Sequence, residues 1–366
     1  MGSSNDHPDP LRHRPSTAAG SGLRVVAIGG GTGLSTLLKG LKRYVSPSSE
    51  RPSAKSGKPE ICDLSAVVTV SDDGGSSGRL RKELNMLPPG DIRNCIVALS
   101  EDEALLSKLF QHRFVKGSGL EGHSFGNLFL AALTSITKDF SEAVRLSSEI
   151  LVTRGHIFPA TTSNVELEAL MEDGTRVRGE TKITASRVRI KELFLVPSDV
   201  EPLAQTLDAI ARADLITIGP GSLFTSLIPN LLVNGIPQAI ASSPAIKVYI
   251  CNLMTQANES IGRTAADHIQ ALNGHAQANI FDYALLNRKS ISAELKAKYA
   301  LEGATQVVVD QGAIKELGVR PMLGDYLDEG GVARHATDRI ACDLLELVVR
   351  ARSEEQPASK RHTTST

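Results

Sequence analysis

The sequence lacks any long apolar run. No stretch approaches the about 20 residues that a helix needs to cross a bilayer. The first 22 residues are rich in Ser, Pro, His and Gly and lack the apolar segment of a signal peptide. We therefore expect no membrane span and a cytoplasmic location. We also expect residues 1–22 to be a disordered leader and residues 351–366, rich in Ser and Thr, a disordered tail.

An excess of charge of either sign is also missing. Forty basic and 41 acidic residues give a formal net charge of -1, so no global attraction draws the chain to nucleic acid or a membrane surface. Any anion site must then be local, and nucleic acid is not an expected partner. The four cysteines have no C-x-x-C spacing, and three lie inside apolar runs. We interpret them as reduced and structural.

Several catalytic motifs are absent as well. The sequence contains no G-x-S-x-G elbow, no G-x-x-x-x-G-K-[ST] phosphate loop and no H-E-x-x-H zinc motif. No protein nucleophile stands out, so no catalytic residue is assigned. Such a site suits ligand binding, or phosphoryl-type transfer in which placement and electrostatics do most of the work.

Strands that alternate with helices are what the sequence does contain. A β-branched run, Leu23 to Ile28, meets a glycine-rich turn and a helix-like stretch, Leu34 to Tyr44. Asp214 to Ile218, followed by another glycine turn and a helix, repeats this arrangement. The pattern predicts an α/β fold with a doubly wound, mainly parallel Rossmann-like sheet and helices on both faces. Ligands of such sheets bind at the carboxyl ends of the strands.

Residues 23–350 are predicted to form one domain. Residues 46–60, rich in Ser, Pro, Lys and Gly, indicate a flexible insertion. Alternating charged and apolar residues over about 157–197, with a hairpin at Asp173-Gly174, predict a small antiparallel excursion. A short strand is expected at Val307 to Val309.

The turn after the first strand supplies four glycines in five residues, including Gly30, Gly31 and Gly33 around Thr32. Without Cβ atoms, several backbone N–H groups can converge on a phosphate. Glycines at a strand-to-helix turn also arise purely for close packing, and both interpretations stay open. Leu34 occupies the third glycine position of the dinucleotide fingerprint, which makes NAD a less fitting ligand.

A second glycine-rich loop follows the strand that ends near Val70. Asp72 and Asp73 precede a run of small residues that includes Gly74, Gly75 and Ser76. The two carboxylates could hold Mg²⁺ or accept hydrogen bonds from a ribose. The alternative is turn chemistry, which Asp and Gly favour.

Two helix starts carry further polar residues. Asp91 and Asn94 lie near one another at the first start, where Asp91 either contacts a ligand or caps the helix, and Arg93 is a solvated charge if it points outward. At the second, His123 and Asn127 are one turn apart. With Ser124 they form a candidate anion site, the alternative being a capping or surface histidine. We expect the apolar stripe of that second helix to pack into a core; it comprises Phe125, Leu128, Phe129, Ala132, Leu133 and Ile136.

The later strand ends add two more groups. Gly219, Gly221 and Ser222 form either an anion-binding nest or a good helix start. Neutral polar side chains that could orient a sugar or base follow the next strand, at Asn252, Thr255 and Gln256.

Read in order, these motifs resemble the YvcK/CofD-like family. The resemblance rests on Ile28 to Ser35, Thr69 to Gly78, Pro88 to Asn94, Gly122 to Leu128, Gly219 to Ser226, Pro229 to Leu232, Tyr249 to Gln256 and Arg334-His335. It covers nearly the whole chain outside the leader, the insertion and the tail. One departure is Ala257-Asn258 before Glu259, where the family has Pro or Gly and then Gly.

The family implies two kinds of function. YvcK-type members, called gluconeogenesis factors, bind UDP-sugars and regulate carbon metabolism and cell-wall morphogenesis. CofD-type members are Mg²⁺-dependent transferases that move a phospholactyl group from a guanosine diphosphate donor to the deazaflavin Fo. The second loop and the first helix start match the YvcK pattern. By this resemblance the glycine turns hold a nucleotide diphosphate and Arg334 contacts the nucleotide-sugar.

The resemblance also bears on partners and metal. Protein partners in cell-wall synthesis and a homodimer are expectations of the YvcK type. In the transferase alternative, Mg²⁺ sits at Asp72 and Asp73, and Asp91 joins them as a catalytic candidate.

Overall fold

The computed structural model describes residues 22–46, 59–101, 103–257 and 259–354. The predicted leader lies outside these ranges except for its last residue. The same holds for residues 47–58 of the predicted insertion and for 355–366 of the predicted tail. Residues 351–354, which we expected in the tail, instead complete the last helix, α14 (Thr337–Glu354).

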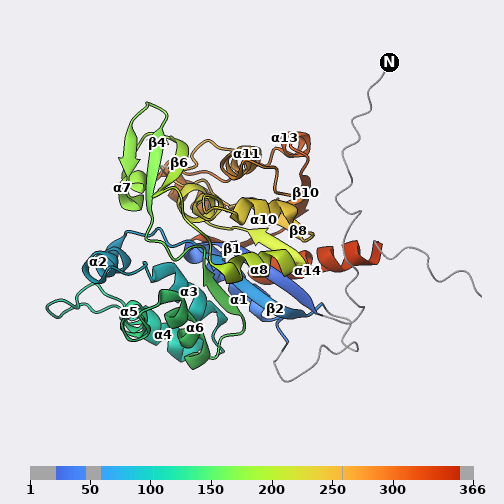
Figure 1. Cartoon of the computed structure of the whole chain (residues 1–366). Helices are drawn as coiled ribbons and strands as arrows, with labels where there is room; N and C mark the ends of the chain where they lie inside the picture. Colours follow the sequence, from blue (N-terminus) through green and yellow to red (C-terminus); the bar gives the residue numbers. More distant parts are fainter. Residues whose placement is uncertain (1–21, 47–58, 102, 258, 355–366) are drawn as a thin grey trace, which may run out of the picture.

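A seven-stranded sheet forms the centre of the fold (Figure 1). Every pairing within it is parallel, and the strand order is β10-β9-β8-β7-β1-β2-β3. The strands are β1 (Leu23–Gly29), β2 (Ile61–Val68), β3 (His156–Pro159), β7 (Leu215–Ile218), β8 (Ile246–Ile250), β9 (Tyr283–Asn287) and β10 (Arg320–Gly324). The predicted parallel α/β class is confirmed.

The sheet has a topological switch point between β1 and β7. From β1 the chain proceeds through β2 to β3 at one edge, then returns to β7 on the other side of β1 and continues to β10. This is the strand order of dinucleotide-binding folds, in which ligands bind where the direction of winding reverses. The turns after β1 and β7 therefore start from neighbouring strand ends.

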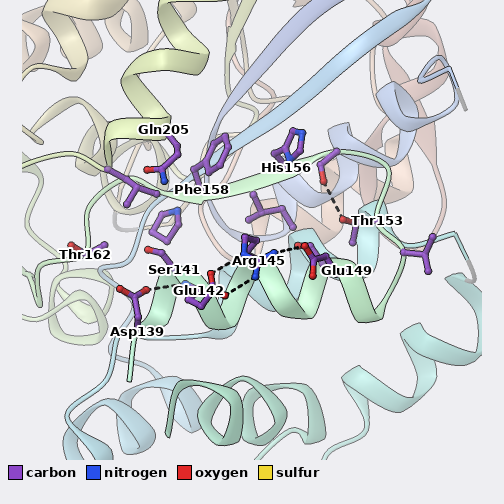
Figure 2. Close-up of a pocket in the computed structure, with 16 residues that line it drawn as sticks. Asp139, Ser141, Glu142, Arg145, Glu149, Thr153, His156, Phe158, Thr162 and Gln205 are labelled. Atoms are coloured by element: carbon purple, nitrogen blue, oxygen red, sulfur yellow. Dashed lines mark hydrogen bonds and ion pairs between the residues drawn. The ribbon is translucent and has the colours of Figure 1, made fainter. Parts of the chain in front are cut away.

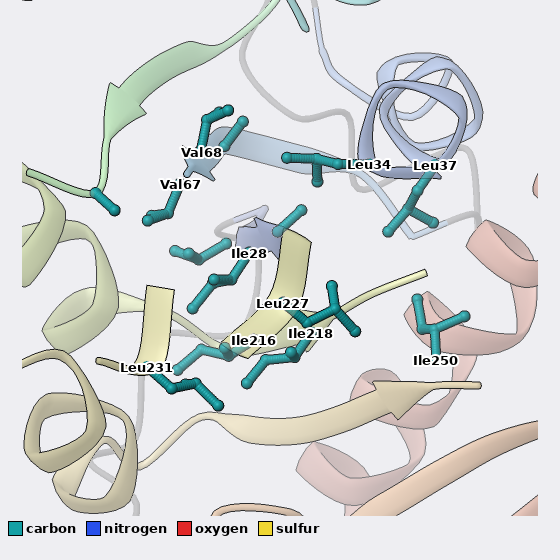
Figure 3. Packing of buried hydrophobic residues seen from close by; sticks show 14 of the residues in the cluster. Ile28, Leu34, Leu37, Val67, Val68, Ile216, Ile218, Leu227, Leu231 and Ile250 are labelled. Carbon is teal, nitrogen blue, oxygen red and sulfur yellow. The ribbon is translucent and has the colours of Figure 1, made fainter. Parts of the chain in front are cut away.

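Helices cover both faces of this sheet. The central strands are buried almost throughout because they consist of Val, Ile, Leu and Ala, as expected for a sheet covered on both sides. Leu34 and Leu37 of α1 (Gly31–Lys42) lie on one side of the strands and Leu231 of α9 (Ile228–Leu231) on the other (Figure 3). Helix α1 also packs against α14 and against α3 (Gly90–Leu99).

A group of helices connects β2 to β3. It comprises α2 (Gly75–Leu84), α3, α4 (Glu103–Gln111), α5 (Phe125–Thr137) and α6 (Phe140–Ile150). The expected core-packing face of α5 is right for Phe125, Leu128 and Phe129, which pack against the core, and wrong for Ala132 and Ile136. Its buried residues are Gly126, Asn127, Leu130 and Ala131, whereas Ala132 is exposed and Ile136 is 76% exposed. The helix packs mainly against α6 and α4, and its small and polar side meets α2 and α3 through the hydrogen bonds of Asn127 to Ser76 and Arg93.

The antiparallel excursion is confirmed in part. A three-stranded sheet has the order β5-β4-β6, built from β4 (Glu166–Met171), β5 (Arg176–Arg178) and β6 (Ile190–Val196). Its β4 and β5 are joined at the predicted hairpin, and helix α7 (Glu180–Ala185) is inserted before β6. The first part of the expected range was wrongly placed, because β3 joins the parallel sheet beside β2.

The last third of the chain completes the covering layers. Helices α8 (Ala204–Arg212), α10 (Ile236–Ser242), α11 (Ala265–Ala276), α12 (Ala293–Ala300) and α13 (Gln311–Glu316) lie here, together with a hairpin of β11 (Leu327–Glu329) and β12 (Ala333–His335). No strand forms at residues 307–309, where backbone bonds from the Leu253 and Ala265 region hold an extended loop. Within the described ranges no single helix is long and apolar enough to span a membrane; Leu223–Leu231 and Ile236–Ser242, bent by 77°, meet that test only together.

Candidate functional site

The turns after β1 and β7 pack backbone against backbone. A Cβ atom added to Gly33 would lie 2.2 Å from the carbonyl oxygen of Pro220 and 3.0 Å from Cα of Gly221. No side chain fits into this contact, so the glycine is required by close approach. The structure thus brings the first and the last predicted glycine turns together at the switch point.

The amino end of α1 lies in this contact. Helix α1 begins at Gly31, and its N-cap residue, Gly30, offers no side chain to its free N–H groups. The N–H of Gly31 donates to the carboxylate of Asp91. The side chain of Thr32 is exposed beside it. Most of the predicted glycine turn is therefore the first turn of a helix.

Asp91 reaches across to this helix end. Its Oδ2 lies 2.9 Å from the position that a Cβ of Gly30 would occupy. Burial, reinforced by the carboxylate of Asp72, raises the pKa of Asp91 to about 6, while the Gly31 N–H opposes the rise. The alternative that Asp91 caps its own helix is wrong, because α3 has Pro89 as N-cap residue and no side-chain cap.

Asp72 and Asp73 point to different partners. Asp72 accepts from the N–H of Gly74 at 2.8 Å, and its other oxygen faces Gly90 at the start of α3. Asp73 accepts from the N–H and the hydroxyl of Thr181 at 2.9 and 2.5 Å. Asp72 thus stays in the carboxyl edge, whereas Asp73 ties the loop to α7. The described ranges contain no group of three or more His, Cys, Asp or Glu arranged to hold a metal ion.

A further acidic residue, Glu180, joins this edge and was not predicted. It is the first residue of α7, and its burial together with the charges of Asp72, Asp91, Asp73 and Glu259 raises its pKa to about 8. The sequence places it in a charged, alternating stretch after a hairpin, where no motif of a ligand site marked it. Only the fold of the small sheet brings it to the site.

Behind Asp72, the ends of α2 and α5 share a buried polar network. The Oγ of Ser76 lies 2.9 Å from Nδ1 of His123 and accepts from the side-chain amide of Asn127 at 3.1 Å. His123 is 2% and Asn127 1% exposed, so the surface alternative for His123 is wrong. Burial, followed by the charge of Arg79, lowers the pKa of His123. Neutral His123 therefore acts as a hydrogen-bonding group.

Arg93 completes this network and is not a solvated charge. Its Nη1 donates to Ser124 Oγ at 2.6 Å and to Asn127 Oδ1 at 2.9 Å, and its Nη2 donates to Asn94 Oδ1 at 2.8 Å. Burial lowers its pKa, while Asp91 and Asp72 oppose that change. The guanidinium interacts electrostatically with Asp91 and Asp72, and it joins α3 to α5. Ser124 also caps α5 through the N–H of Asn127.

Residues after β8 hold the turn after β7. The side-chain amide of Asn252 accepts from the N–H of Gly221 at 3.1 Å and donates to its carbonyl at 2.7 Å. Gln256 donates to Ser222 Oγ at 2.9 Å. Thr255 pairs with the backbone of Thr305 instead. These polar groups, predicted to orient a sugar or base, are engaged in fixing loops.

Arg334 lies in strand β12, next to His335. Its neighbour His335 contacts the carbonyl of Cys251 through Nε2 at 3.0 Å, which anchors the β11-β12 hairpin to the end of β8. Burial lowers the pKa of His335 to about 4. The side chain of Arg334 is exposed, and among the described residues no contact joins it to the glycine turns. Its predicted role in ligand binding stays a prediction.

A hollow of about 860 Å³ lies elsewhere, along edge strand β3 between α6 and the start of α8 (Figure 2). None of the predicted site residues lines it. Its central cation, Arg145, is paired with Glu142 at 2.6 Å and with Glu149, and Asp139 already caps α6. The candidate site lies instead at the glycine turns, where the N-cap residues of the following helices, Gly30 and Ser222, make no side-chain cap.

Comparison with known proteins agrees with the motifs. A family model described as 2-phospho-L-lactate transferase CofD matches residues 25–327. A protein of Halalkalibacterium halodurans named gluconeogenesis factor is 51% identical over 88% of this chain and 95% of its own length. One of the same name from Bacillus subtilis is 48% identical over 89% and 98%. A crystal structure from Bacillus halodurans, 49% identical, superposes with a TM-score of 0.82 over 89% of this chain and 99% of that one.

Proposed function

Because this chain belongs to the 2-phospho-L-lactate transferase CofD family, we propose that it binds a nucleoside diphosphate ligand, a UDP-sugar, at the switch point of its sheet. We propose further that it acts in the cytoplasm as a regulator of carbon metabolism and cell-wall morphogenesis, through protein partners. Its similarity to two proteins named gluconeogenesis factor supports this role over that of a transferase.

One observation carries the ligand site: the contact between the β1 and β7 turns at Gly33 and Pro220. It places the amino end of α1 at the point where ligands of this strand order bind. The first-turn N–H groups of Thr32 and Gly33 have no carbonyl partner one turn earlier. Their dipoles favour a diphosphate, and the glycines admit it without a Cβ clash.

The rest of the edge fits the other parts of such a ligand. On the β2 side, the partly exposed side chain of Asn94 supplies a neutral hydrogen-bonding group, and the buried network of Ser76, Asn127 and Arg93 holds it in place. Arg334 and the hairpin of β11 and β12 border the β8 side. A nucleotide-sugar that spans the edge has its charged middle at α1 and its two neutral ends beside these groups.

Calorimetric titration and thermal unfolding with UDP-N-acetylglucosamine, UDP-glucose, UDP, GDP and NAD test the proposal. We expect UDP-sugars to bind, to raise the melting temperature and to be recovered unchanged. A ligand present at 100 times its dissociation constant adds about 2.7 kcal/mol to the free energy of unfolding. No binding of any UDP-sugar to the full chain would refute the proposal.

Transferase activity is the second candidate, favoured by the carboxyl groups beside the β1 turn. Asp72 and Asp91 could share Mg²⁺ with a donor diphosphate, which is how this cation usually binds nucleotides. Incubation with Mg²⁺, a lactyl guanosine diphosphate donor and Fo distinguishes the two candidates. Release of guanosine monophosphate with formation of phospholactyl-Fo would establish the transferase.

A further inference from the structure

We propose that Glu259 is a positioning residue that holds the β7 turn in its ligand-ready geometry without contacting the ligand. The inference rests on the proposed ligand site and assigns a role within it. Glu259 lies in the segment where the sequence departs from the family pattern, directly after Ala257-Asn258.

The carboxylate of Glu259 closes the amino end of the helical turn that follows β7. This turn, η1 (Leu223–Leu227), is a π-helix whose N-cap residue, Ser222, makes no side-chain cap. Glu259 Oε2 accepts from the N–H of Phe224 at 3.3 Å, and Oε1 accepts from the hydroxyl of Thr225 at 2.8 Å. The N–H of Thr225 also donates to this carboxylate.

The side chain of Glu259 is buried behind the β7 turn, so it can support the turn but is not exposed to a ligand. Glu259 is 3% exposed, and burial raises its pKa against the opposing effect of the three donors. A buried carboxylate is costly unless its hydrogen bonds are made, so the chain keeps it here only together with these partners. Because the N–H groups of Phe224 and Thr225 are engaged, they are not available to a phosphate.

The neighbours of Glu259 act on the same turn. The side-chain amide of Asn252 bonds both to the N–H and to the carbonyl of Gly221, and the side-chain amide of Gln256 donates to Ser222 Oγ. The N–H of Gln256 in turn donates to the Oγ of Ser260, which is fully buried. Asn252, Gln256 and Glu259 thus form a clamp whose contacts end on residues of the β7 turn, at Gly221, Ser222, Phe224 and Thr225. That turn supplies the backbone against which Gly33 packs, so the clamp sets the position of the amino end of α1.

The test compares Glu259→Gln with the matched surface variant Glu149→Gln in the full chain, using UDP-N-acetylglucosamine as the probe. Glutamine has one acceptor oxygen where the carboxylate has two, and its NH₂ group cannot accept from a backbone N–H. We expect Glu259→Gln to bind about 10- to 100-fold more weakly, the size seen for residues that orient a metal ligand. Glu149 is exposed and paired with Arg145, so its variant should bind as the natural chain does.

A second pair of variants and a second readout separate positioning from mere stability. Thr225→Val removes one donor and should weaken binding, whereas Thr225→Ser keeps the hydroxyl and should restore it. Affinities are measured well below the melting temperature, together with amide exchange of residues 221–226. Faster exchange confined to these residues, with weaker binding, supports the inference.

The outcomes also separate this inference from the proposed function. If the natural chain binds no UDP-sugar, the proposed function is refuted, and the positioning role of Glu259 is refuted with it because it rests on that ligand. If the natural chain binds and Glu259→Gln binds equally well or more tightly, the proposed function stands and the positioning role is refuted. A lower melting temperature with unchanged affinity gives the same refutation, since it shows a purely structural residue.

Discussion

Among single residues, Glu180 places an acidic group in surroundings that oppose its charge. Its carboxyl faces Asp72, Asp91, Asp73 and Glu259, all acidic, in a partly buried position. A carboxyl placed in this way keeps its proton at neutral pH. The edge of the sheet therefore carries less negative charge at pH 7 than the count of its acidic residues indicates.

The protonation of Glu180 predicts how stability depends on pH. Between its ordinary pKa of 4.5 and the raised value of about 8, the folded chain holds a proton that the unfolded chain has lost. Its contribution to stability therefore falls as pH rises through this interval. We expect Glu180→Gln, which cannot ionise, to exceed the natural chain in free energy of unfolding by about 1 to 3 kcal/mol at pH 8.5; the residue's partial contact with water reduces the full effect.

Urea unfolding monitored by circular dichroism at pH 5, 7 and 8.5 measures this difference, which should shrink toward pH 5. Glu302→Gln is the control, because that carboxyl is exposed. An equal gain from both variants, or a gain from Glu180→Gln that does not change with pH, would contradict the raised pKa.

Gly33 offers a second test at the residue scale. Alanine at this position puts a methyl group 2.2 Å from the Pro220 carbonyl, so the two turns must separate. We expect Gly33→Ala to lose about 1 to 3 kcal/mol of stability, the usual range for overpacking, and to lose UDP-sugar binding as well. Chemical denaturation and calorimetry measure the two effects.

Gly274→Ala is the matched control for this substitution. Gly274 lies in α11 with nothing within 4 Å of its Cβ position, so alanine should raise helix stability by up to about 1 kcal/mol and leave binding unchanged. If Gly33→Ala behaved like Gly274→Ala, the close packing of the two turns would be disproved.

At the scale of elements, the small antiparallel sheet is joined to the site by α7. Two hydrogen bonds from Thr181 end on Asp73, and Gly179 has φ +99° with Asp73 Oδ2 2.7 Å from its Cβ position. A second connection runs from Arg81 of α2 to Asn164 and to the carbonyl of Val165. The loop after β2 and helix α2 are thus hydrogen-bonded to the small sheet at two places, one just before β4 and one in α7, after β5.

Removing the first connection should loosen α7 alone. We expect Asp73→Ala to speed amide exchange of residues 180–185 about fivefold, which corresponds to about 1 kcal/mol of local stability. The central sheet should exchange as before, because its bonds do not involve Asp73. Lys182→Ala, an exposed change on the same helix, is the control and should not alter exchange. Uniform acceleration over the whole chain would show that Asp73 supports the fold rather than this one contact.

The sequence predicted the elements that have a strong local pattern. The units at β1 and β7 were found because a β-branched run, glycines and an amphipathic helix follow one another. In α5 the same reasoning found Phe125 and Phe129, which pack against the core, but missed the more deeply buried face that Gly126 and Asn127 form. Tertiary packing against α2 and α3 decides that face, and a helical repeat alone does not carry this information.

The sequence pointed to the glycine turns as the candidate site, but it did not indicate the residues from other segments that lie beside these turns. Asp91 and Asp72, both selected from local motifs, lie close enough to interact, and the residues that surround them come from distant segments. Glu180 arrives through the small sheet, and Glu259 reaches back to a turn more than thirty residues earlier. Such contacts depend on strand order, which no local spacing in this sequence encodes.

At the scale of the whole molecule, basic and acidic residues nearly balance, so the electrostatic potential at the site is set by the charged groups close to it. The formal net charge is -1, so no long-range attraction draws a diphosphate toward the protein. The edge itself carries Asp72 and Asp91, with Arg93 as the cation of the adjoining network. A ligand with two or more negative charges therefore meets repulsion that the amide dipoles of α1 must overcome.

A divalent cation bound together with the ligand would remove this repulsion. Mg²⁺ usually takes one or two carboxylates, several waters and the phosphates of a nucleotide, so it needs no complete cluster in the ligand-free chain. We expect 5 mM Mg²⁺ to tighten UDP-sugar binding about tenfold relative to EDTA, a difference of about 1.4 kcal/mol. Asp72→Asn should lose most of this dependence, because its oxygen faces the start of α3 beside Asp91, whereas Asp173→Asn on the distant hairpin should keep it. Titrations at fixed ionic strength exclude general screening as the cause, and equal affinity with Mg²⁺ and with EDTA would show that the amide dipoles of α1 suffice without a cation.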